Sequence, residues 1–374
     1  MAISFNNISI GSGVALTITP PPATIYLWSW GRNTKGQLGL GNTTTTSSPV
    51  QVGALTTWLT IAAGSYDSLA IKTDGTMWSW GGNYNGRLGL GNTTHYSSPK
   101  QIGALTTWSS IATGSIGHNM AIKTDGTLWG WGYNYEYPLG LGDQTDRSSP
   151  VQIGALTNWS KVSGGSIHTL AVKTDGTLWS WGKNLNTGVL GLGNTTNYSS
   201  PKQVGAGTTW STIDAGDYHS MAIKTDGTMW SWGNNGYGRL GLNNTTSRSS
   251  PVQIGALTTW LSVSAGSYHN LAIKTDGTMW SWGKNGSGRL GLGDETDISS
   301  PVQIGALTTW LSISGGSDHS SAIKTDGTMW SWGYNSYGRL GLGNTTSRSS
   351  PIQIGSLTNW VNISIKGQSA MAIG

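Results

Sequence analysis

The chain has 374 residues, with 57 Gly, 21 Trp and only 10% charged residues, a composition that predicts an all-β protein with many turns and excludes a disordered chain. It contains no Cys, which excludes a disulfide framework, a thiolate metal site and a cysteine nucleophile. Its 21 basic and 16 acidic residues are spread thinly along the sequence, so we interpret the net charge of +5 as an aid to solubility and do not expect a nucleic-acid partner.

Residues 1–23 precede the repeated part of the sequence. Residues 3–10 and 14–19 alternate between apolar and polar side chains as strands do, and the prolines from Pro20 to Pro22 predict a stiff, extended spacer. We expect this extension to be an anchoring arm that adds a strand to the sheet of a partner and mediates assembly, with a disordered leader as the alternative. The segment lacks the pattern of a Sec-type signal peptide, and no apolar run approaches the ~20 residues of a membrane helix. We therefore expect a soluble chain without membrane insertion.

From residue 24 onward, the motif Trp-x-Trp-Gly marks a repeat. Successive copies start 50 or 51 residues apart, at Trp28, Trp78, Trp129, Trp179, Trp230, Trp280 and Trp330. Single inserted residues, Gly117 in one copy and one residue between Trp181 and Leu190 in another, account for the two longer spacings. Such a period favours radial repetition, so residues 24–374 are predicted to form a seven-bladed β-propeller with four strands per blade.

Each copy contains four short apolar segments that we interpret as strands. In one copy they are residues 251–254, 260–264, 271–274 and 278–282. The clearest pairing is a hairpin around Asp276-Gly277, because Asp-Gly between alternating runs is typical of a tight turn. Trp280 and Trp282 lie two residues apart, so both indoles occupy one face of their strand and can pack on the next sheet. Pro251 suits the start of an edge strand, where no ladder N–H is needed.

The two ends of the repeated part complement each other. Six copies contain Lys-Thr-Asp-Gly, whereas the chain stops at Gly374, where the seventh hairpin would turn. Near the other end, residues 26–30 form a predicted strand without a partner. We therefore expect the N- and C-terminal strands to pair and complete one blade, which closes the ring and leaves no open sheet edge.

The repeat has the pattern Ala-Gly-Ser-Tyr-His-x-Leu-Ala-Ile-Lys-x-Asp-Gly-x-x-Trp-x-Trp-Gly-x-Asn-x-x-Gly-Arg-Leu-Gly-Leu-Gly. It resembles the repeat of the regulator-of-chromosome-condensation family, and the resemblance covers residues 24–374. The resemblance implies a seven-bladed propeller whose faces bind other macromolecules. It does not imply one activity, because the founding member is a nucleotide exchange factor for a small GTPase, while other members do different work on the same fold.

Three Trp recur in each copy, and one His recurs in five. Presence in every copy is more simply explained by packing than by binding. The histidines are His118, His168, His219, His269 and His319, with Asp67 at the same position of the first copy. Equivalent residues of packed sheets lie about 10 Å apart, whereas Zn–N bonds are about 2 Å long, so we do not expect a metal ring. We expect these histidines to bond to loop backbone.

Carboxylates are scarce and lie mostly in turns. Asp143 and Asp146 in one copy, and Asp294 and Asp297 in another, replace the Asn-Thr-Thr of the other copies. Clustered oxygens suit Ca²⁺, but each loop offers few ligands and lacks the EF-hand pattern, so calcium remains only an alternative. We expect no catalytic residue, no metal ligand and no cofactor.

Differences between the copies are concentrated after Trp-Gly, after Gly-Leu-Gly and at the residue before His. These loops are rich in Tyr, Asn, Ser and Gly, which suits adaptable contact surfaces, although drift in unconstrained loops would give the same pattern. The candidate binding residues are Tyr66, Tyr84, Tyr133, Tyr135, Tyr137, Tyr218, Tyr237, Tyr268 and Tyr337.

These observations favour a non-enzymatic binding propeller that engages a protein partner through its loop faces. The low charge, the polar surface and the arm suggest a component of a viral or extracellular particle. One alternative is a carbohydrate-binding propeller that stacks sugars on the loop tyrosines. A second alternative is a GTPase exchange factor. The repeats contain no insertion longer than one residue that could serve as a wedge in a nucleotide site, which speaks against this alternative.

Overall fold

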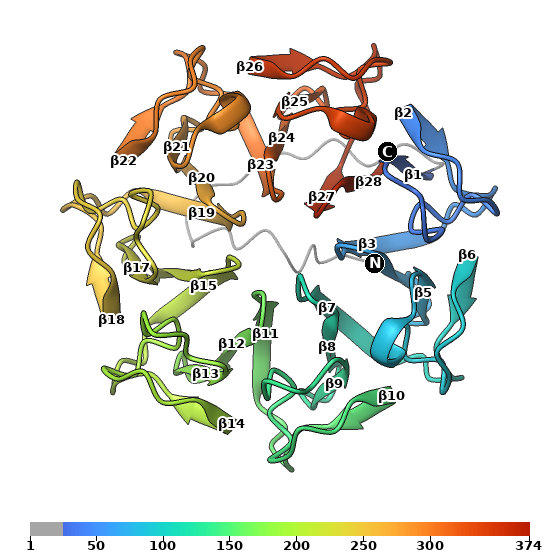
Figure 1. Cartoon of the computed structure of the whole chain (residues 1–374), viewed down its shortest axis with the longest axis horizontal. Coiled ribbons are helices and arrows are strands. Elements are labelled where there is room, and N and C mark those ends of the chain that lie inside the picture. The colour runs from blue at the N-terminus through green and yellow to red at the C-terminus, as the bar shows by residue number, and fades with distance from the viewer. Residues whose placement is uncertain (1–24) are drawn as a thin grey trace.

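The computed structural model describes residues 25–374, which form seven four-stranded antiparallel sheets arranged as blades around a central axis (Figure 1). The predicted all-β, seven-bladed propeller is therefore confirmed. Blades 1 to 6 each consist of four consecutive strands, starting at β3, β7, β11, β15, β19 and β23. Blade 7 has the strand order β27-β28-β1-β2 from the axis outward.

The first strand of each blade lies nearest the axis, and the second pairs with it. The first strands are β3 (Trp58–Ala63), β7 (Trp108–Thr113), β11 (Trp159–Gly164), β15 (Trp210–Ala215), β19 (Trp260–Ala265), β23 (Trp310–Gly315) and β27 (Asn362–Lys366). The second strands are β4 (Asp67–Lys72), β8 (His118–Lys123), β12 (His168–Lys173), β16 (His219–Lys224), β20 (His269–Lys274), β24 (His319–Lys324) and β28 (Ser369–Ile373).

The third strand carries the Trp-x-Trp-Gly motif, and the fourth forms the outer rim. The third strands are β5 (Met77–Gly81), β9 (Leu128–Gly132), β13 (Leu178–Gly182), β17 (Met229–Gly233), β21 (Met279–Gly283), β25 (Met329–Gly333) and β1 (Leu27–Gly31). The fourth strands are β6 (Tyr96–Gln101), β10 (Arg147–Gln152), β14 (Tyr198–Gln203), β18 (Arg248–Gln253), β22 (Ile298–Gln303), β26 (Arg348–Gln353) and β2 (Thr46–Gln51). Three 3-10 turns precede fourth strands: η1 (Tyr84–Gly86), η2 (Gly286–Gly288) and η3 (Ser336–Gly338).

The predicted Asp-Gly hairpin joins the second and third strands. In blade 5 the Gly277 N–H donates to Lys274 O (2.9 Å) and the Lys274 N–H donates to Thr278 O (3.0 Å). Gly277 has φ +76, a left-handed conformation that glycine adopts without steric cost. The Asp276 carboxylate accepts the Thr278 N–H (2.9 Å), which locks the turn. The hairpin prediction is confirmed.

The tryptophans pack the blades against one another. Trp282 is fully buried and clusters with Trp260 of its own blade and with Met221 and Ile223 of blade 4. Trp260 meets Trp280 and Trp282 edge-on or tilted, with ring centroids 6.0 and 6.4 Å apart. The two indoles of the motif therefore share one face and pack on the neighbouring sheet, as their spacing predicts.

The chain ends complete blade 7. Strand β1 pairs with β28 in antiparallel register, from Leu27 opposite Ile373 to Gly31 opposite Ser369. Two further bonds, Tyr26 N–H to Gly374 O (3.0 Å) and Gly374 N–H to Tyr26 O (3.1 Å), extend the ladder. Closure of the ring by the terminal strands is thus confirmed.

The outer strand begins earlier than expected. In blade 4 it runs from Arg248 to Gln253, so Pro251 lies inside the strand and not at its start. The register between β17 and β18 shifts between Ser231 and Gly233, and this irregularity accommodates a residue without an N–H on an edge strand. The arm expected at residues 1–23 lies outside the described residues. Within residues 25–374 no helix has the length and apolarity needed to cross a bilayer.

Candidate binding face

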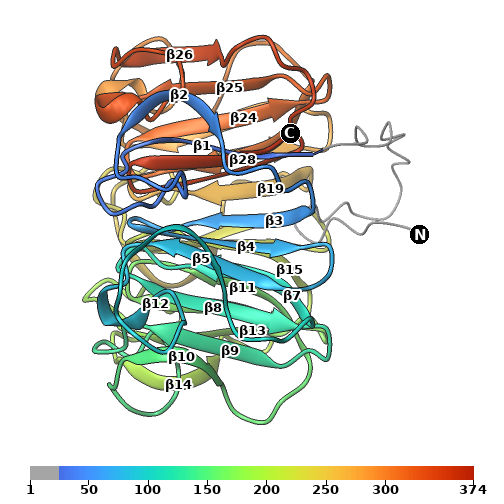
Figure 2. The same cartoon turned by 90° about the vertical axis from the view of Figure 1, so that its right-hand side faces the viewer.

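Two sets of loops meet on one face of the propeller. Because successive strands are antiparallel, the turn between the first and second strands and the loop between the third and fourth strands lie at the same end of each blade. We call this end the loop face and the opposite end, with the Asp-Gly hairpins, the hairpin face. In the edge-on view of Figure 2 the short 3-10 turns lie on the left, on the loop face.

A buried asparagine fixes the backbone of each long loop. In blade 4 the Asn235 side chain accepts the Leu240 N–H (2.8 Å) and donates to the carbonyls of Asn244 (2.9 Å) and Thr246 (3.1 Å). Fully buried counterparts occupy the same place in all seven blades: Asn33, Asn83, Asn134, Asn184, Asn235, Asn285 and Asn335. Since the asparagine holds the loop, the side chains around it are free to vary.

The acidic loops use their carboxylates on their own backbone. Asp146 accepts the Asn134 N–H (2.7 Å) and Asp297 accepts the Asn285 N–H (2.7 Å), a role that Ser247 plays in blade 4. Asp143 forms a 2.6 Å ion pair with Arg147. No cluster of three or more metal-ligating acids or histidines occurs in residues 25–374. These aspartates therefore act as turn residues, the interpretation that the sequence favours over calcium.

The recurring histidines form a buried ring beneath the loop face. All five are fully buried, and desolvation lowers the pKa of His118, His168 and His219 to about 3. Three of them, His168, His219 and His269, have side chains of the next blade as hydrogen-bond partners and not the expected loop backbone. His219 Nε2 lies 2.6 Å from Asn270 Oδ1, and His269 Nε2 lies 2.8 Å from Ser320 Oγ. For these three the expected partner was wrong, because the packing of consecutive blades places a polar side chain of the next second strand within hydrogen-bond distance of Nε2.

The Ser–His pairs do not form a nucleophile with its base. The Ser320 hydroxyl donates a hydrogen bond to Arg289 O (2.8 Å), so its oxygen accepts the hydrogen bond from His269 Nε2–H. A general base needs that nitrogen unprotonated and within reach of substrate. Both side chains are fully buried, so this pair serves to link the blades.

The tyrosines of blades 4 and 5 surround an arginine. The Arg239 guanidinium carbon lies 5.5 Å from the ring centre of Tyr218, 5.3 Å from that of Tyr237 and 5.1 Å from that of Tyr268. The Lys284 ammonium lies 4.7 and 5.1 Å from the Tyr237 and Tyr268 rings. These cation–π contacts assemble side chains from two blades into one cluster.

The same pattern continues through blades 6, 7 and 1. Arg32 lies 5.3 Å from the Tyr337 ring and 5.6 Å from the Tyr66 ring, which bridges blades 6, 7 and 1. Tyr66 in turn meets Tyr84 edge-on at 6.5 Å. We call this continuous set the Arg–Tyr arc. It comprises Tyr218, Tyr237, Arg239, Tyr268, Lys284, Arg289, Asp318, Tyr334, Tyr337, Arg339, Arg32, Lys35, Tyr66, Tyr84 and Arg87.

Blades 2 and 3 have a different surface. Pro138 and Val189 stand where blades 4, 5, 6 and 1 have arginine, and Ile116, 42% exposed, stands where blade 5 has Tyr268. Tyr133, Tyr135 and Tyr137 share the loop between β9 and β10, and Tyr135 is 63% exposed. The structure thus brings six of the nine predicted tyrosines into the arc and leaves the three of blade 2 in a separate sector, which lacks the buried arginine.

Sequence reasoning missed the cations of this face. The basic residues are spread thinly in the sequence, and we expected them only to aid solubility. The fold instead concentrates seven of them on this face. The arc holds Arg32, Lys35, Arg87, Arg239, Lys284, Arg289 and Arg339 and the acid Asp318, while the buried Asp67 lies 3.8 Å from Arg87. The available signal was the recurrence of six of them, all but Lys35, at two repeat positions: directly after Trp-Gly and within Gly-Arg-Leu-Gly. Tyr334 was likewise left out of the predicted set.

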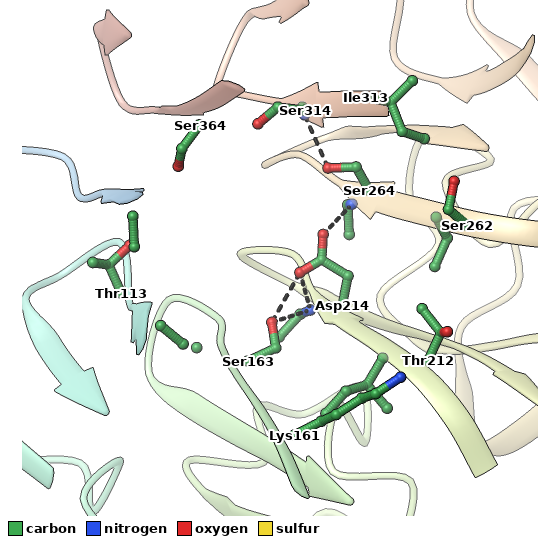
Figure 3. A pocket seen from close by; sticks show the side chains of 18 of the residues that line it. Thr113, Lys161, Ser163, Thr212, Asp214, Ser262, Ser264, Ile313, Ser314 and Ser364 are labelled. Atoms are coloured by element: carbon green, nitrogen blue, oxygen red, sulfur yellow. Dashed lines mark hydrogen bonds between the residues drawn. The ribbon is translucent and has the colours of Figure 1, made fainter. Parts of the chain in front are cut away.

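A polar cavity of about 300 Å³ lies on the axis, lined by the first strands of all seven blades (Figure 3). Its side chains link neighbouring blades: Asp214 accepts from the Ser163 hydroxyl and the Ala265 N–H, both at 2.8 Å. Lys366 donates to Thr113 O (2.6 Å) and Gly164 O (2.8 Å), which joins blade 7 to blades 2 and 3. These bonds form a belt that holds the inner strands together.

Comparison with solved structures shows the same fold. Prp20p from Saccharomyces cerevisiae, described for its binding to Gsp1p and histones, gives a TM-score of 0.83 at 20% identity, covering 95% of this chain and 92% of that chain. Human WBSCR16 gives a TM-score of 0.85 at 18% identity, covering 94% and 99%. No curated protein matches the sequence.

Family comparison identifies the repeat itself. The RCC1-like domain matches residues 118–372, and the Regulator of chromosome condensation (RCC1) repeat matches residues 26–71, 74–122 and, in a second form, 59–87. The matched residues span most of the chain, as the repeat pattern predicts. The chain belongs to the RCC1 repeat family.

Proposed function

We propose that this propeller is a non-catalytic module that binds a protein partner through the Arg–Tyr arc of its loop face. The observation that carries the proposal is the continuity of the arc over blades 4, 5, 6, 7 and 1. Tyrosine and arginine dominate the energetically important centres of protein interfaces, because both offer a large contact area together with a polar end. The buried Ser–His pairs, and the use of Asp214 and Lys366 of the axial cavity in bonds between blades, support a non-catalytic role.

Several arc tyrosines are accessible to a partner. Tyr84, Tyr237, Tyr334 and Tyr337 are between 39% and 44% exposed. The description of Prp20p by its binding to Gsp1p and histones supports a protein as the kind of partner that such a propeller takes. The viral or extracellular particle has no support beyond the sequence, and the arm at residues 1–23 stays a hypothesis about assembly.

Site-specific photo-crosslinking tests the proposal. A benzoylphenylalanine is introduced in the full chain as Tyr237→benzoylphenylalanine on the loop face or as Leu257→benzoylphenylalanine on the hairpin face, where Leu257 is 47% exposed. Irradiation in the source organism should join one protein to position 237 and not to position 257. The purified partner should then bind the isolated propeller in vitro. Cross-links confined to position 257 would overturn the proposal.

The lectin alternative is less well supported by the arc. Sugars stack on free aromatic faces, and the cations already occupy the rings of Tyr218, Tyr237 and Tyr268. A glycan array separates the two functions: reproducible binding that is lost in Tyr135→Ala or Tyr268→Ala would favour the lectin. For the exchange-factor alternative, a nucleotide-release assay with a small GTPase should be negative, since the loops differ by single residues only.

A further inference from the structure

Four blades carry an arginine at the same place in the Gly-Arg-Leu-Gly loop, and they provide internal controls for one another. These arginines are Arg87, Arg239, Arg289 and Arg339, and all are at most 5% exposed. A buried guanidinium stays charged, so each must be compensated by hydrogen bonds or by an anion.

Three of the four are compensated within the chain. Arg87 donates to Tyr84 O (3.1 Å) and Ile116 O (2.8 Å) and lies 3.8 Å from Asp67. Arg289 donates to Gly286 O (3.0 Å) and pairs with Asp318 at 2.8 Å.

Arg339 donates to the carbonyl and the hydroxyl of Ser336 (3.1 and 2.8 Å) and lies 3.9 Å from Asp318. Each of these three arginines thus lies within 4 Å of an aspartate, Asp318 being shared by Arg289 and Arg339, and each Nε–H reaches a loop carbonyl. Of their buried nitrogens, only the Nη1 of Arg339 has no hydrogen-bond acceptor in residues 25–374.

Arg239 differs from all three. Its side chain makes a single long hydrogen bond, from Nη1 to Ser267 O (3.4 Å), and its buried Nε–H has no acceptor in residues 25–374. No carboxylate of the described chain lies within ion-pair distance of it. Burial lowers the pKa of Arg239, as it does that of Arg339, while the three tyrosines and the more distant Asp217 act in the opposite direction.

The reason lies in the residue that the next blade presents. Arg289 faces Asp318 of blade 6, whereas Arg239 faces Tyr268, which stands at the equivalent position of blade 5. The surroundings of Arg239, which we call the Arg239 slot, therefore consist of three tyrosine rings and a second cation, Lys284. The nearest acid that acts on its charge, Asp217, lies beyond ion-pair distance and accepts a hydrogen bond from Ser115. Tyr237, 39% exposed, is the most exposed of the three rings and separates Arg239 from solvent on that side.

We propose that the Arg239 slot, walled by Tyr218, Tyr237 and Tyr268 and flanked by Lys284, binds a glutamate or aspartate side chain of the protein partner. This inference rests on the proposed function and names its anchor point. The incoming carboxylate takes the place relative to Arg239 that Asp318 has relative to Arg289. A carboxylate fits better than a phosphate because the chain itself fills the neighbouring slots with aspartate.

Fluorescence anisotropy with labelled peptides tests the inference on the full chain. The probe is a Gly/Ser nonapeptide with two central Glu, compared with matched peptides carrying two Gln or two phosphoserines. The Glu peptide should bind and the Gln peptide should not. Arg239→Met should weaken binding at least tenfold. Arg239→Lys should weaken it less, because the positive charge remains while the paired N–H donors of the guanidinium are lost. Arg348→Met, which removes an arginine from outer strand β26, should leave binding within twofold.

Each other outcome has a definite meaning. Equal binding of the Glu peptide by the wild type and Arg239→Met, or no binding of it at all, overturns the inference, provided that melting curves show both proteins folded. Tighter binding of the phosphoserine peptide overturns the choice of a carboxylate. A partner that cross-links to position 237 and binds Arg239→Met with unchanged affinity sinks this inference alone, whereas cross-links only to position 257 sink the proposed function as well.

Discussion

The two faces of this propeller are made by the same repeat, yet they differ in what their side chains do. On the hairpin face each side chain holds another: Asp276 accepts from Thr278 (2.7 Å), Thr278 accepts from Trp280 Nε1 (2.9 Å), and the Lys274 ammonium lies 3.6 Å from the Trp280 ring centre. The same Lys-Thr-Asp-Gly pattern recurs in six blades, so its charges balance within each copy. A substitution at any of these positions therefore removes a contact that holds the hairpin.

On the loop face the framework is separated from the contact surface. Buried asparagine and tryptophan residues hold the loop, and the intervening positions carry Arg, Lys, Tyr, Ile or Pro in different blades. This separation lets one end of a near-perfect repeat become asymmetric without loss of the fold. The asymmetry is what a specific partner can recognise.

The largest expected effect is acid unfolding that begins on the loop side. The histidine ring is neutral in the fold, with a pKa of about 3 for His168 against 6.5 in the unfolded chain, so the unfolded state binds more protons between these values. Stability is therefore complete above pH 6.5 and falls as the pH drops, by about 1.4 kcal/mol per pH unit for each histidine. Urea unfolding at pH 7.5 and pH 5 measures this loss.

The hairpin carboxylates, unlike the histidines, should not change their protonation state in this pH range. Hydrogen bonds from Thr278 lower the pKa of Asp276, so this group stays ionised throughout the window in which the histidines titrate. His168→Gln should reduce the proton uptake on unfolding by one. A stability that is flat between pH 7.5 and pH 5 would contradict the buried, neutral ring.

The next effect is confined to the hairpin face. Gly277 has φ +76, and a Cβ there would lie 2.1 Å from Thr308 O, so Gly277→Ala should cost about 3 kcal/mol through overpacking and strain. Gly255 has φ +60 with no atom within 4 Å of the same Cβ, so Gly255→Ala carries only the conformational strain, about 1 kcal/mol. Equal losses in chemical denaturation would show that the tight contact at the hairpin is relieved by relaxation.

The smallest effect separates the two faces directly. Asp276→Ala removes two hydrogen bonds from the hairpin and should cost about 1–2 kcal/mol of unfolding free energy. Tyr237→Ala on the loop face should change stability by no more than about 0.5 kcal/mol, because the loop is held by Asn235, while it weakens partner binding. A Tyr237→Ala variant as unstable as Asp276→Ala would mean that the tyrosine supports the fold.

Local pattern was enough to predict most of the architecture. The period of Trp-x-Trp-Gly, the Asp-Gly turn and the position of the ends predicted the blades, their hairpins and the β1–β28 pairing, since each depends on neighbours in sequence or on simple counting. The start of the outer strand at Arg248 was missed because the register shift that admits Pro251 has no signature in single residues. The tyrosines were predicted correctly as loop residues. Their division into an arc and a separate blade 2 cluster was not predicted.

The sequence by itself determined the repeat, the closed ring and the loops in which the copies differ, because hydrophobic alternation and turn chemistry act over a few residues. Only the tertiary structure decided which loop residues meet. Arg239 and Ser267 are 28 residues apart and belong to adjacent blades, and the packing of one blade on the next places them in contact. Whether a cation has an aspartate or a tyrosine beside it depends on that juxtaposition, and this is why Arg239 alone among four equivalent arginines has no ion pair in the described chain.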